Sequence, residues 1–467
     1  MKNIFTPTIL KRSLLLSVVG SSLLTNPVSS QTYTALSTGM SAGVYSLAYD
    51  SAKSLIYAGG DFIKAGGGTV NHASSWNGTT WAYMGMNMGT DYSMIGTNDT
   101  IQSMVMWGGK LYAGGAFTTA YGSAAGHIAQ WSGTMAWTGW KPGMNGNVRA
   151  LAVYKGALYA AGSFTDADGA TVSNIAMLSS VSGSWAAVGN GLNGEVEVLQ
   201  VYNGKLYAGG HFTSSGSTTV NHVAAWDGTN WTALGGGCTT TSASAAMVHA
   251  MTVHNGALYI GGMFSSVNGS TATNIAKWDG TNWSAVGSIG TSSAGSIEAL
   301  ASYKGALIAG GTFSTADGNA INNIAMWNGS AWYSLGGVNG PIHAFCTTSA
   351  SLYIGGVFTM AGTTVAANIV KLSALPPLSV NQLDKKTEGL VVYPNPTTNA
   401  LKFALDIPNG DYNLCVSNLV GQIVYSSKIN VSGQYTGTLD VSSYEKGAYF
   451  LSVKGGNATL DTKVLVY

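Results

Sequence analysis

Short apolar runs, each bounded by glycine, asparagine or aspartate, alternate with polar turns along most of the chain. Runs of five to eight apolar residues between such turn-forming residues are typical of β-strands joined by hairpins. One run, LYAGGxF or a close variant, occurs seven times at intervals of 45 to 55 residues, with its phenylalanine at Phe62, Phe117, Phe164, Phe212, Phe264, Phe313 and Phe358.

Each unit of this repeat contains four apolar runs in a constant order. A run such as VRALAVY precedes LYAGGxF, and a polar loop, an NIAxW run, a short DGT or NGS turn and a WxALG run follow it. The runs lack polar alternation, which indicates strands covered on both faces, and no segment after residue 30 shows helical periodicity. A four-stranded unit of this length is typical of a propeller blade. The sequence therefore predicts an all-β, seven-bladed β-propeller.

The seventh unit is incomplete in sequence. It ends near Leu372 and has no WxALG run after it, whereas the segment YTALS at residues 33–37 resembles such a run and has no unit of its own. We therefore expect residues 33–37 to pair with residues 368–372 and to complete the last blade. This N-terminal strand would close the ring and remove its free edges.

The repeat stops after the proline pair Pro376–Pro377. A polar stretch to Glu388 is followed by runs such as VVYPNP, GQIVYSSKI and GAYFLSV. They predict five to seven short strands in a small β-sandwich of about 80 residues. The expected organisation is a signal peptide over residues 1–30, a propeller over 31–375, a linker over 376–388 and a C-terminal domain over 389–467.

Composition supports a folded, exported protein with little net charge. Of the 467 residues, 46% are hydrophobic and only 8% are charged, which excludes a disordered chain. The formal net charge of +1 offers no electrostatic basis for binding nucleic acid or anionic lipid. Glycine, at 64 residues, supplies the backbone freedom that many hairpin turns need.

The first 30 residues have the layout of a secretory signal peptide. Lys2, Lys11 and Arg12 precede an apolar run at 13–24, and small residues at 28–30 offer a cleavage site. No other run is long and apolar enough for a membrane helix. The three cysteines, Cys238, Cys346 and Cys415, are too few for a disulfide framework or a metal cluster. A bridge between Cys238 and Cys346 and two isolated thiols both stay open.

The repeat resembles kelch-type propellers, and more closely secreted bacterial and fungal surface propellers with a YIGGxF…IAxWDGxxWxxLG pattern. The resemblance covers residues 31–375 and concerns the fold more than any activity. Two units depart from the pattern, because Leu178 and Leu372 stand at the first tryptophan position.

The C-terminal segment resembles the C-terminal sorting domain of type IX secretion cargo from Bacteroidota. The resemblance covers residues 390–467. It implies handling by the type IX secretion machinery, with the propeller released or attached at the cell surface. An ordinary terminal β-sandwich used for adhesion is the alternative. The residues that carry the resemblance are Tyr393, Pro394, Asn395, Pro396, Gly421, Gly447, Tyr449 and Lys463.

One polar position recurs at the second residue of each innermost strand. Because propellers bring their first strands together around a central channel, we expect these side chains to converge near the mouth of that channel. They are Tyr45, Gln102, Arg149, Glu197, His249, Glu298 and His343.

Two interpretations of this ring stay open. Arg149 can pair with Glu197, and each histidine with a neighbouring glutamate, in a purely structural arrangement. The ring can instead form a polar site for a small ligand or a sugar. In a variant of the second interpretation, Glu197 and Glu298 serve as the acid and base of a carbohydrate-active hydrolase.

Other candidates favour structural roles. His72, His127 and His222 stand where other units carry asparagine, which indicates a turn or a capping hydrogen bond. The DADG segment at 166–169 lacks the glutamate of a calcium loop and predicts a surface turn. The recurring tryptophans favour packing between blades, and Trp107 and Trp140, outside the repeat, are expected to be exposed, where they could stack on a sugar ring.

The sequence contains no phosphate-binding loop, paired-histidine zinc motif or nucleophile elbow. We expect no metal and no cofactor. The favoured function is therefore a non-catalytic, exported propeller that binds a protein or a glycan, and a secreted carbohydrate-active hydrolase is the alternative.

Overall fold

The computed structural model describes residues 32–85, 95–134, 136–140, 142–181, 183–241, 246–291, 295–375, 389–393, 395, 397–407, 409–418, 422–432, 435–455 and 458–467. All regular elements in these ranges are β-strands. The chain divides into two compact units, Met1–Leu378 and Ser379–Tyr467. The expected signal peptide, residues 1–30, and the expected linker, residues 376–388, lie outside the described residues.

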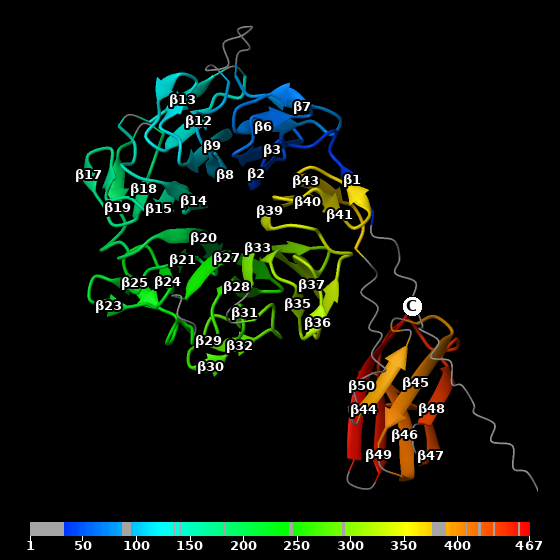
Figure 1. The fold of residues 1–467 in the computed structure, drawn as a ribbon. Helices are drawn as coiled ribbons and strands as arrows, with labels where there is room; N and C mark the ends of the chain where they lie inside the picture. Colours follow the sequence, from blue (N-terminus) through cyan, green and yellow to red (C-terminus); the bar gives the residue numbers. More distant parts are fainter. Residues whose placement is uncertain are drawn as a thin grey trace, which may run out of the picture. The chain divides into compact units, whose positions relative to one another are not determined.

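The first unit contains, within its described residues, seven antiparallel sheets of four strands each, arranged as a ring (Figure 1). In order of pairing, the sheets are β2 (Val44–Asp50), β3 (Leu55–Gly60), β6 (Ala73–Trp76) and β7 (Trp81–Tyr83); β8 (Ile101–Trp107), β9 (Lys110–Gly115), β12 (Ile128–Trp131) and β13 (Trp137–Gly139); β14 (Val148–Tyr154), β15 (Ala157–Gly162), β18 (Ile175–Leu178) and β19 (Trp185–Ala187); β20 (Val196–Tyr202), β21 (Lys205–Gly210), β24 (Val223–Trp226) and β25 (Trp231–Ala233); β27 (Met247–His254), β28 (Ala257–Met263), β31 (Ile275–Trp278) and β32 (Trp283–Ala285); β33 (Ser296–Tyr303), β34 (Ala306–Thr312), β37 (Ile324–Trp327) and β38 (Trp332–Ser334); β39 (Ile342–Thr347), β40 (Leu352–Gly356), β43 (Ile369–Leu372) and β1 (Tyr33–Ala35).

Short hairpins, whose strands have two residues each, lie between the second and third strands of the sheets. They are β4 (Lys64–Ala65) with β5 (Gly68–Thr69), β10 (Thr119–Ala120) with β11 (Ser123–Ala124), β16 (Asp166–Ala167) with β17 (Ala170–Thr171), β22 (Ser214–Ser215) with β23 (Thr218–Thr219), β29 (Ser266–Val267) with β30 (Ser270–Thr271), β35 (Thr315–Ala316) with β36 (Asn319–Ala320), and β41 (Met360–Ala361) with β42 (Thr364–Val365); β26 (Cys238–Thr239) adds a third strand to the β29–β30 hairpin.

The first strands of neighbouring sheets contact one another in a closed cycle. The order is β2, β8, β14, β20, β27, β33 and β39, and β39 contacts β2 again. These strands therefore line the centre of the ring, and the tryptophan-bearing strands lie toward its outside (Figure 1). Buried side chains of adjacent sheets form the cores between them, as with Ala150 and Leu199 from β14 and β20.

The two ends of the first unit share one sheet, as the sequence predicts. β1 pairs with β43 in antiparallel register, with Tyr33 opposite Leu372 and Ala35 opposite Val370. The Tyr33 hydroxyl donates a hydrogen bond to the carbonyl oxygen of Leu335 in the preceding unit. The predicted closure by the N-terminal strand is confirmed.

Tryptophan side chains connect consecutive sheets. The indole Nε1 at the start of an outermost strand donates to a carbonyl oxygen just beyond the outermost strand of the preceding unit: Trp137 to Met84 at 3.0 Å, Trp231 to Val188 at 2.9 Å and Trp332 to Val286 at 2.8 Å. Trp81 makes the same bond to Leu36, directly after β1, at 3.0 Å. The predicted packing of the recurring tryptophans between units is confirmed.

The second unit consists of two antiparallel sheets in its described residues. One contains β44 (Gly389–Tyr393), β45 (Ala400–Asp406) and β48 (Tyr435–Asp440), and the other contains β47 (Ile423–Val431), β46 (Gly410–Asn418), β49 (Gly447–Gly455) and β50 (Ala458–Val466). Buried residues of both sheets, such as Phe403 and Leu451, belong to one hydrophobic core.

Candidate functional site

Every ring residue predicted from the sequence is the extra residue of a β-bulge. The pairing between the first and second strands skips one residue in all seven sheets: Tyr45 in β2, Gln102 in β8, Arg149 in β14, Glu197 in β20, His249 in β27, Glu298 in β33 and His343 in β39. A bulge redirects the side chain that it carries and is common beside functional sites. Seven bulges at one level therefore aim seven side chains at one place.

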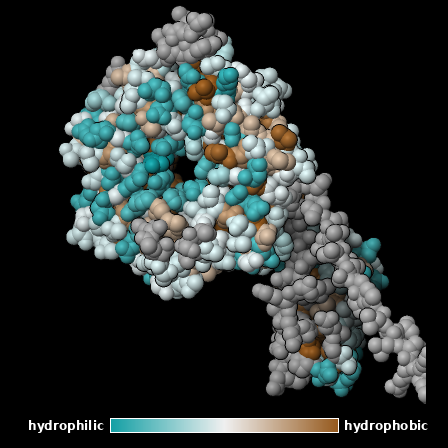
Figure 2. All heavy atoms as spheres, viewed as in Figure 1, coloured by the Kyte–Doolittle hydropathy of each residue, from teal (hydrophilic) through white to brown (hydrophobic). Residues whose placement is uncertain are grey.

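These seven side chains line a single cavity of about 410 Å³ at the central channel, together with Asp61 and Thr100. Figure 2 shows hydrophilic side chains around the central opening of the ring. The side-chain carbonyl oxygen of Gln102 is buried and has no hydrogen-bond partner among the described residues. Because a buried acceptor without a partner is costly, this oxygen favours a donor group from a bound molecule.

The glutamates and the arginine of the first unit lie at or beside this cavity. Between residues 31 and 378 the sequence contains only three glutamates, Glu195, Glu197 and Glu298, and one arginine, Arg149. Glu197, Glu298 and Arg149 line the cavity, and Glu195 binds Arg149 directly. With Asp61, four carboxylates and one guanidinium group lie at or beside the cavity, so the cavity favours ligands that donate hydrogen bonds or carry positive charge.

Arg149 is shared by two carboxylates. Its Nε donates a hydrogen bond to Oε1 of Glu195 at 2.8 Å, and the same nitrogen lies 3.9 Å from Oε2 of Glu197. The predicted pairing of Arg149 with Glu197 is thus present, but the closer partner is Glu195, just before β20. Sequence reasoning missed Glu195, because it precedes the apolar strand on which the ring was defined.

The pKa of the Glu197 carboxyl group is raised, mainly because the group is buried. Arg149 opposes this shift, and the neighbouring charge of Glu195 adds to it. A half-buried carboxyl with a raised pKa beside a second carboxyl is an arrangement that proton-transferring sites use.

An aromatic pair lies on another side of the cavity. The rings of Tyr45 and His343 have centroids 4.9 Å apart at 40°. Burial lowers the pKa of His343, and Glu298 and Asp61 oppose that shift. Burial also raises the pKa of Tyr45, with a further contribution from Asp61. The neutral imidazole and phenol present flat faces of the kind on which a ligand ring can pack.

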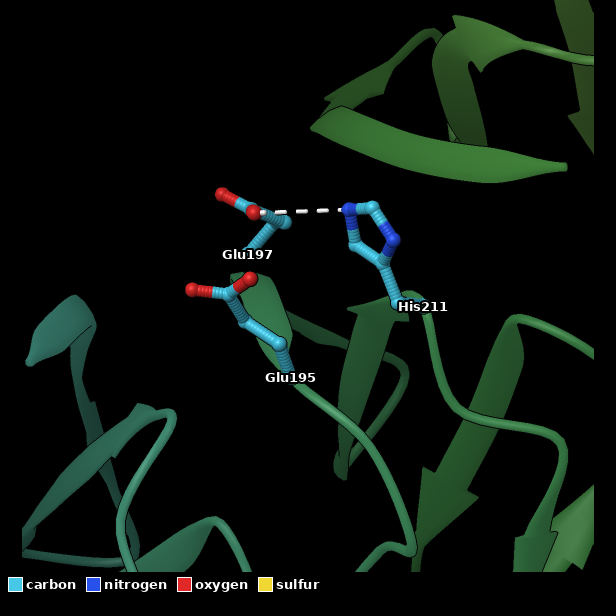
Figure 3. Close-up of side chains that lie close together, drawn as sticks. All are labelled: Glu195, Glu197 and His211. Carbon is cyan, nitrogen blue, oxygen red and sulfur yellow. Dashed lines mark ion pairs between the residues drawn. The ribbon is translucent and has the colours of Figure 1, made fainter. Parts of the chain in front are cut away.

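Glu195, Glu197 and His211 form a compact cluster beside the cavity (Figure 3). Nε2 of His211 lies 3.6 Å from Oε1 of Glu197, and one donor atom of each residue lies within 4.8 Å of the others. His211 directly follows β21, so sequence reasoning missed it as well. A position-by-position comparison of the seven units would have found both Glu195 and His211. In the other six units, Asp61 is the only acidic residue at either position, and neither position carries a histidine.

Three histidines outside the cavity occupy the turn position that the sequence predicts for them. His72, His127 and His222 adopt φ values of 66°, 65° and 69°. The asparagines at the same place in the other units, Asn174, Asn274, Asn323 and Asn368, have φ values of 60° to 65°. Ring Nδ1 of His127 bonds with the carbonyl oxygen of Gly115 at 3.2 Å. The predicted turn position is confirmed.

Two further predictions concern surface residues. Residues 166–169 comprise β16 and the turn at Asp168 and Gly169 that leads to β17, and the Gly169 amide donates to Oδ1 of Asp166; the predicted surface turn is present. Trp107, expected to be exposed, is buried, because its Nε1 donates to the carbonyl oxygen of Gly156 in the next unit at 2.8 Å. Trp140 is half-buried and packs on Trp185.

The cysteines are free thiols. Cys238 and Cys346 are both buried and belong to different cores, in which their neighbours are apolar. Of the two alternatives left by the sequence, the structure therefore contains isolated thiols.

The sorting-signal residues that the structure describes lie near the last strands. The Asn395 amide donates to the carbonyl oxygen of Lys463 at 2.7 Å and accepts from the Leu465 amide at 2.8 Å, which ties the loop after β44 to β50. Tyr449 is buried in β49 and donates to the carbonyl oxygen of Glu445. Gly447 begins β49, and Tyr393, at the end of β44, is exposed. Pro394, Pro396 and Gly421 lie outside the described residues.

Two segments of the chain match known domain families. Residues 129–333 match the Rax2 C-terminal beta propeller domain, and residues 391–467 match the secretion system C-terminal sorting domain. The chain therefore contains a β-propeller domain and a type IX sorting domain. The latter indicates handling by the secretion machinery and export to the cell surface or beyond. Among the described residues, no helix has the length and apolar character that crossing a membrane requires.

No curated protein of similar sequence was found. Solved structures with some similarity include the computationally designed Ika8 protein (13% identity, 74% of this chain and 100% of that chain, TM-score 0.43), the Niastella koreensis GH74 enzyme (13%, 93% and 74%, 0.42) and the Bacteroides ovatus xyloglucan PUL GH43B (13%, 78% and 89%, 0.27). Likenesses of this strength do not bear on activity.

Proposed function

We propose that this protein is an exported, kelch-like, seven-bladed β-propeller that binds a saccharide at the mouth of its central channel without transforming it. A signal peptide over residues 1–30 starts its export. The C-terminal domain over 389–467, a small β-sandwich joined by a linker at 376–388, delivers it through the type IX machinery of a Bacteroidota-type cell. The propeller over 31–375 then acts in the medium or on the outer surface.

The observation that carries this proposal is the convergence of seven bulged side chains on one polar cavity. The scaffold does not require these residue types, since they differ from unit to unit while the residue directly before each of them is always valine or isoleucine. Carboxylates, an amide and imidazoles are suitable partners for sugar hydroxyl groups, and the faces of Tyr45 and His343 are suitable for a sugar ring.

A second candidate is a carbohydrate-active hydrolase. The raised pKa of Glu197 favours it, because a general acid must hold its proton near neutral pH. In this candidate Glu197 donates the proton, and Glu298 or Glu195 is the second carboxylate. The first candidate is preferred because Arg149 already binds Glu195 and lies near Glu197, the carboxylates on this side of the cavity.

A glycan array probed with the purified full chain tests the proposal. We expect binding to one group of glycans, and at least a tenfold loss of affinity in Glu197→Gln and Glu298→Gln. The matched control is Glu445→Gln, an exposed glutamate of the C-terminal unit, which should bind normally. No bound glycan, or unchanged binding by the Glu197→Gln/Glu298→Gln double variant, would overturn the proposal.

Product analysis of the bound glycans separates the two candidates. Glycans recovered intact after long incubation support the binding function. If the natural chain releases shorter sugars and the Glu197→Gln variant does not, the protein is a hydrolase and the binding function is overturned.

A further inference from the structure

The cluster of Glu195, Glu197 and His211 brings two carboxylates and one imidazole together on the side of the channel mouth formed by β20 and β21. Glu195 precedes β20, Glu197 lies within it, and His211 directly follows β21 (Figure 3). One donor atom of each of the three side chains lies within 4.8 Å of the others. All three side chains are partly accessible, so an ion from solution can reach them.

The separation between Glu197 and His211 suits a shared ion better than a direct bond. Oε1 of Glu197 and Nε2 of His211 lie 3.6 Å apart, which is too long for a hydrogen bond. Two ligands of a tetrahedral Zn²⁺, each about 2.0 to 2.1 Å from the metal, lie roughly 3.3 Å apart. The pair is therefore close to the spacing at which one metal ion joins a carboxylate to an imidazole.

The other units of the ring show that the fold does not need these residues. The place of Glu195 is taken by Gly43, Thr100, Asn147, Met247, Ser296 and Pro341, and the place of His211 by Asp61, Ala116, Ser163, Met263, Thr312 and Val357. A structural role common to the units would restrict these positions. The combination of two glutamates and a histidine is specific to the fourth unit.

Two neighbouring residues extend the cluster. The ring of His249 has its centroid 6.3 Å from that of His211, so a side-chain rotation offers its neutral imidazole as a fourth ligand. Arg149 binds only Oε1 of Glu195 at hydrogen-bond distance, which leaves the second oxygen of that carboxylate for an ion. Hydrogen-bonded carboxylates of this kind are common among metal ligands, because the outer partner fixes their orientation.

We propose that Glu195, Glu197 and His211 bind a divalent transition-metal ion, with Zn²⁺ as the best fit and with His249 or water as the remaining ligand. Mixed nitrogen and oxygen donors select such an ion over Ca²⁺ and Mg²⁺, which prefer oxygen ligands only. The site goes beyond the proposed saccharide binding, with which it shares Glu197. A bound ion would offset the excess of carboxylates at the channel mouth.

Isothermal titration of the chelator-treated, purified full chain with Zn²⁺ tests the proposal in the absence of any sugar. We expect one site per chain with micromolar affinity, and at least a tenfold loss in Glu197→Gln and in His211→Ala. His127→Asn is the matched control: it also removes one imidazole, but at a turn where four units carry asparagine, and it should bind as the natural chain does. Co²⁺ should give the visible absorption of a nitrogen- and oxygen-ligated ion, lost in His211→Ala.

Absence of Zn²⁺ binding by the natural chain would overturn the proposal, as would equal affinity in His211→Ala and His127→Asn. Circular dichroism and thermal unfolding of each variant separate loss of ligands from loss of fold. Because the titration contains no sugar, its failure leaves the saccharide proposal standing. A failed glycan array equally leaves the metal site standing.

Discussion

Seven residues with left-handed backbone occupy the same place in the seven units, and their side chain is histidine in three units and asparagine in four. At this scale the sequence is informative, because both residue types tolerate positive φ and bond locally. The choice between them has an electrostatic consequence, since only histidine takes up a proton near neutral pH.

We predict that His72→Asn makes stability less sensitive to acid. Burial lowers the pKa of His72 below its ordinary 6.5, although Asp99 and Asp61 oppose the shift. Between the two pKa values the unfolded chain binds more protons, so native stability falls as the pH drops below about 6.5. The imidazole is partly accessible, so solvent screening keeps the difference between the natural chain and the variant small.

Urea unfolding at pH 8, 6.5 and 5 measures this difference. The difference in the free energy of unfolding between the natural chain and His72→Asn at pH 8 is the reference, because the imidazole is neutral at that pH in both the folded and the unfolded chain. A gap that stays constant from pH 8 to pH 5 would contradict the prediction.

At the scale of the element, the bulge in each first strand decides where the ring side chains point. The second strand must approach the bulge closely, and a Cβ atom placed on Gly210 would lie 2.2 Å from the carbonyl oxygen of Glu195. Any side chain at this position forces the backbone away. The glycine pair of the LYAGG run therefore serves the site as much as the strand.

We predict that Gly210→Ala destabilises the protein by about 2 kcal/mol or more and weakens glycan and Zn²⁺ binding together, because Glu195 and Glu197 move with the bulge. Gly68→Ala is the control, since a Cβ there would have its nearest neighbour, the Ala65 carbonyl oxygen, at 3.7 Å. Chemical denaturation and the two titrations measure these effects. Full affinity in Gly210→Ala would show that the bulge does not position the carboxylates.

The strands, their order and the ring of polar residues follow from the sequence because the repeat presents each element seven times. The bulges could not be predicted from the sequence, since these runs have no polar alternation whose phase one extra residue would shift. Glu195 and His211 were missed because they lie just outside the apolar runs. The expected exposure of Trp107 was wrong, because its burial depends on the Gly156 turn of the next unit, a contact that no local pattern records.

At the scale of the molecule, each sheet depends on its neighbour through an aromatic donor. In the last sheet Tyr33 stands where other sheets have a tryptophan such as Trp231 or Trp332. Its hydroxyl donates a hydrogen bond to the Leu335 carbonyl oxygen, as the indole does in those sheets. The sequence predicted the strand pairing, because YTAL resembles the missing run. The hydroxyl bond that replaces an indole was not foreseen.

We predict that Tyr33→Phe lowers the free energy of unfolding by about 1 to 2 kcal/mol, because it leaves a buried carbonyl group without its donor. Tyr83→Phe is the control: Tyr83 is 50% exposed on the outermost strand β7 and should change stability little. Urea denaturation of the two variants gives the comparison. Equal midpoints would show that the hydroxyl bond contributes nothing to the shared sheet.

The pairing of β1 with β43 also means that the last sheet can close only after both ends of the first unit have been synthesised. Residues 33–35 have no partner until residues 370–372 exist, so a chain interrupted anywhere before Leu372 keeps an open sheet at one end and an unpaired strand at the other. Only a chain that contains both segments escapes the exposed edges that proteases and aggregation exploit.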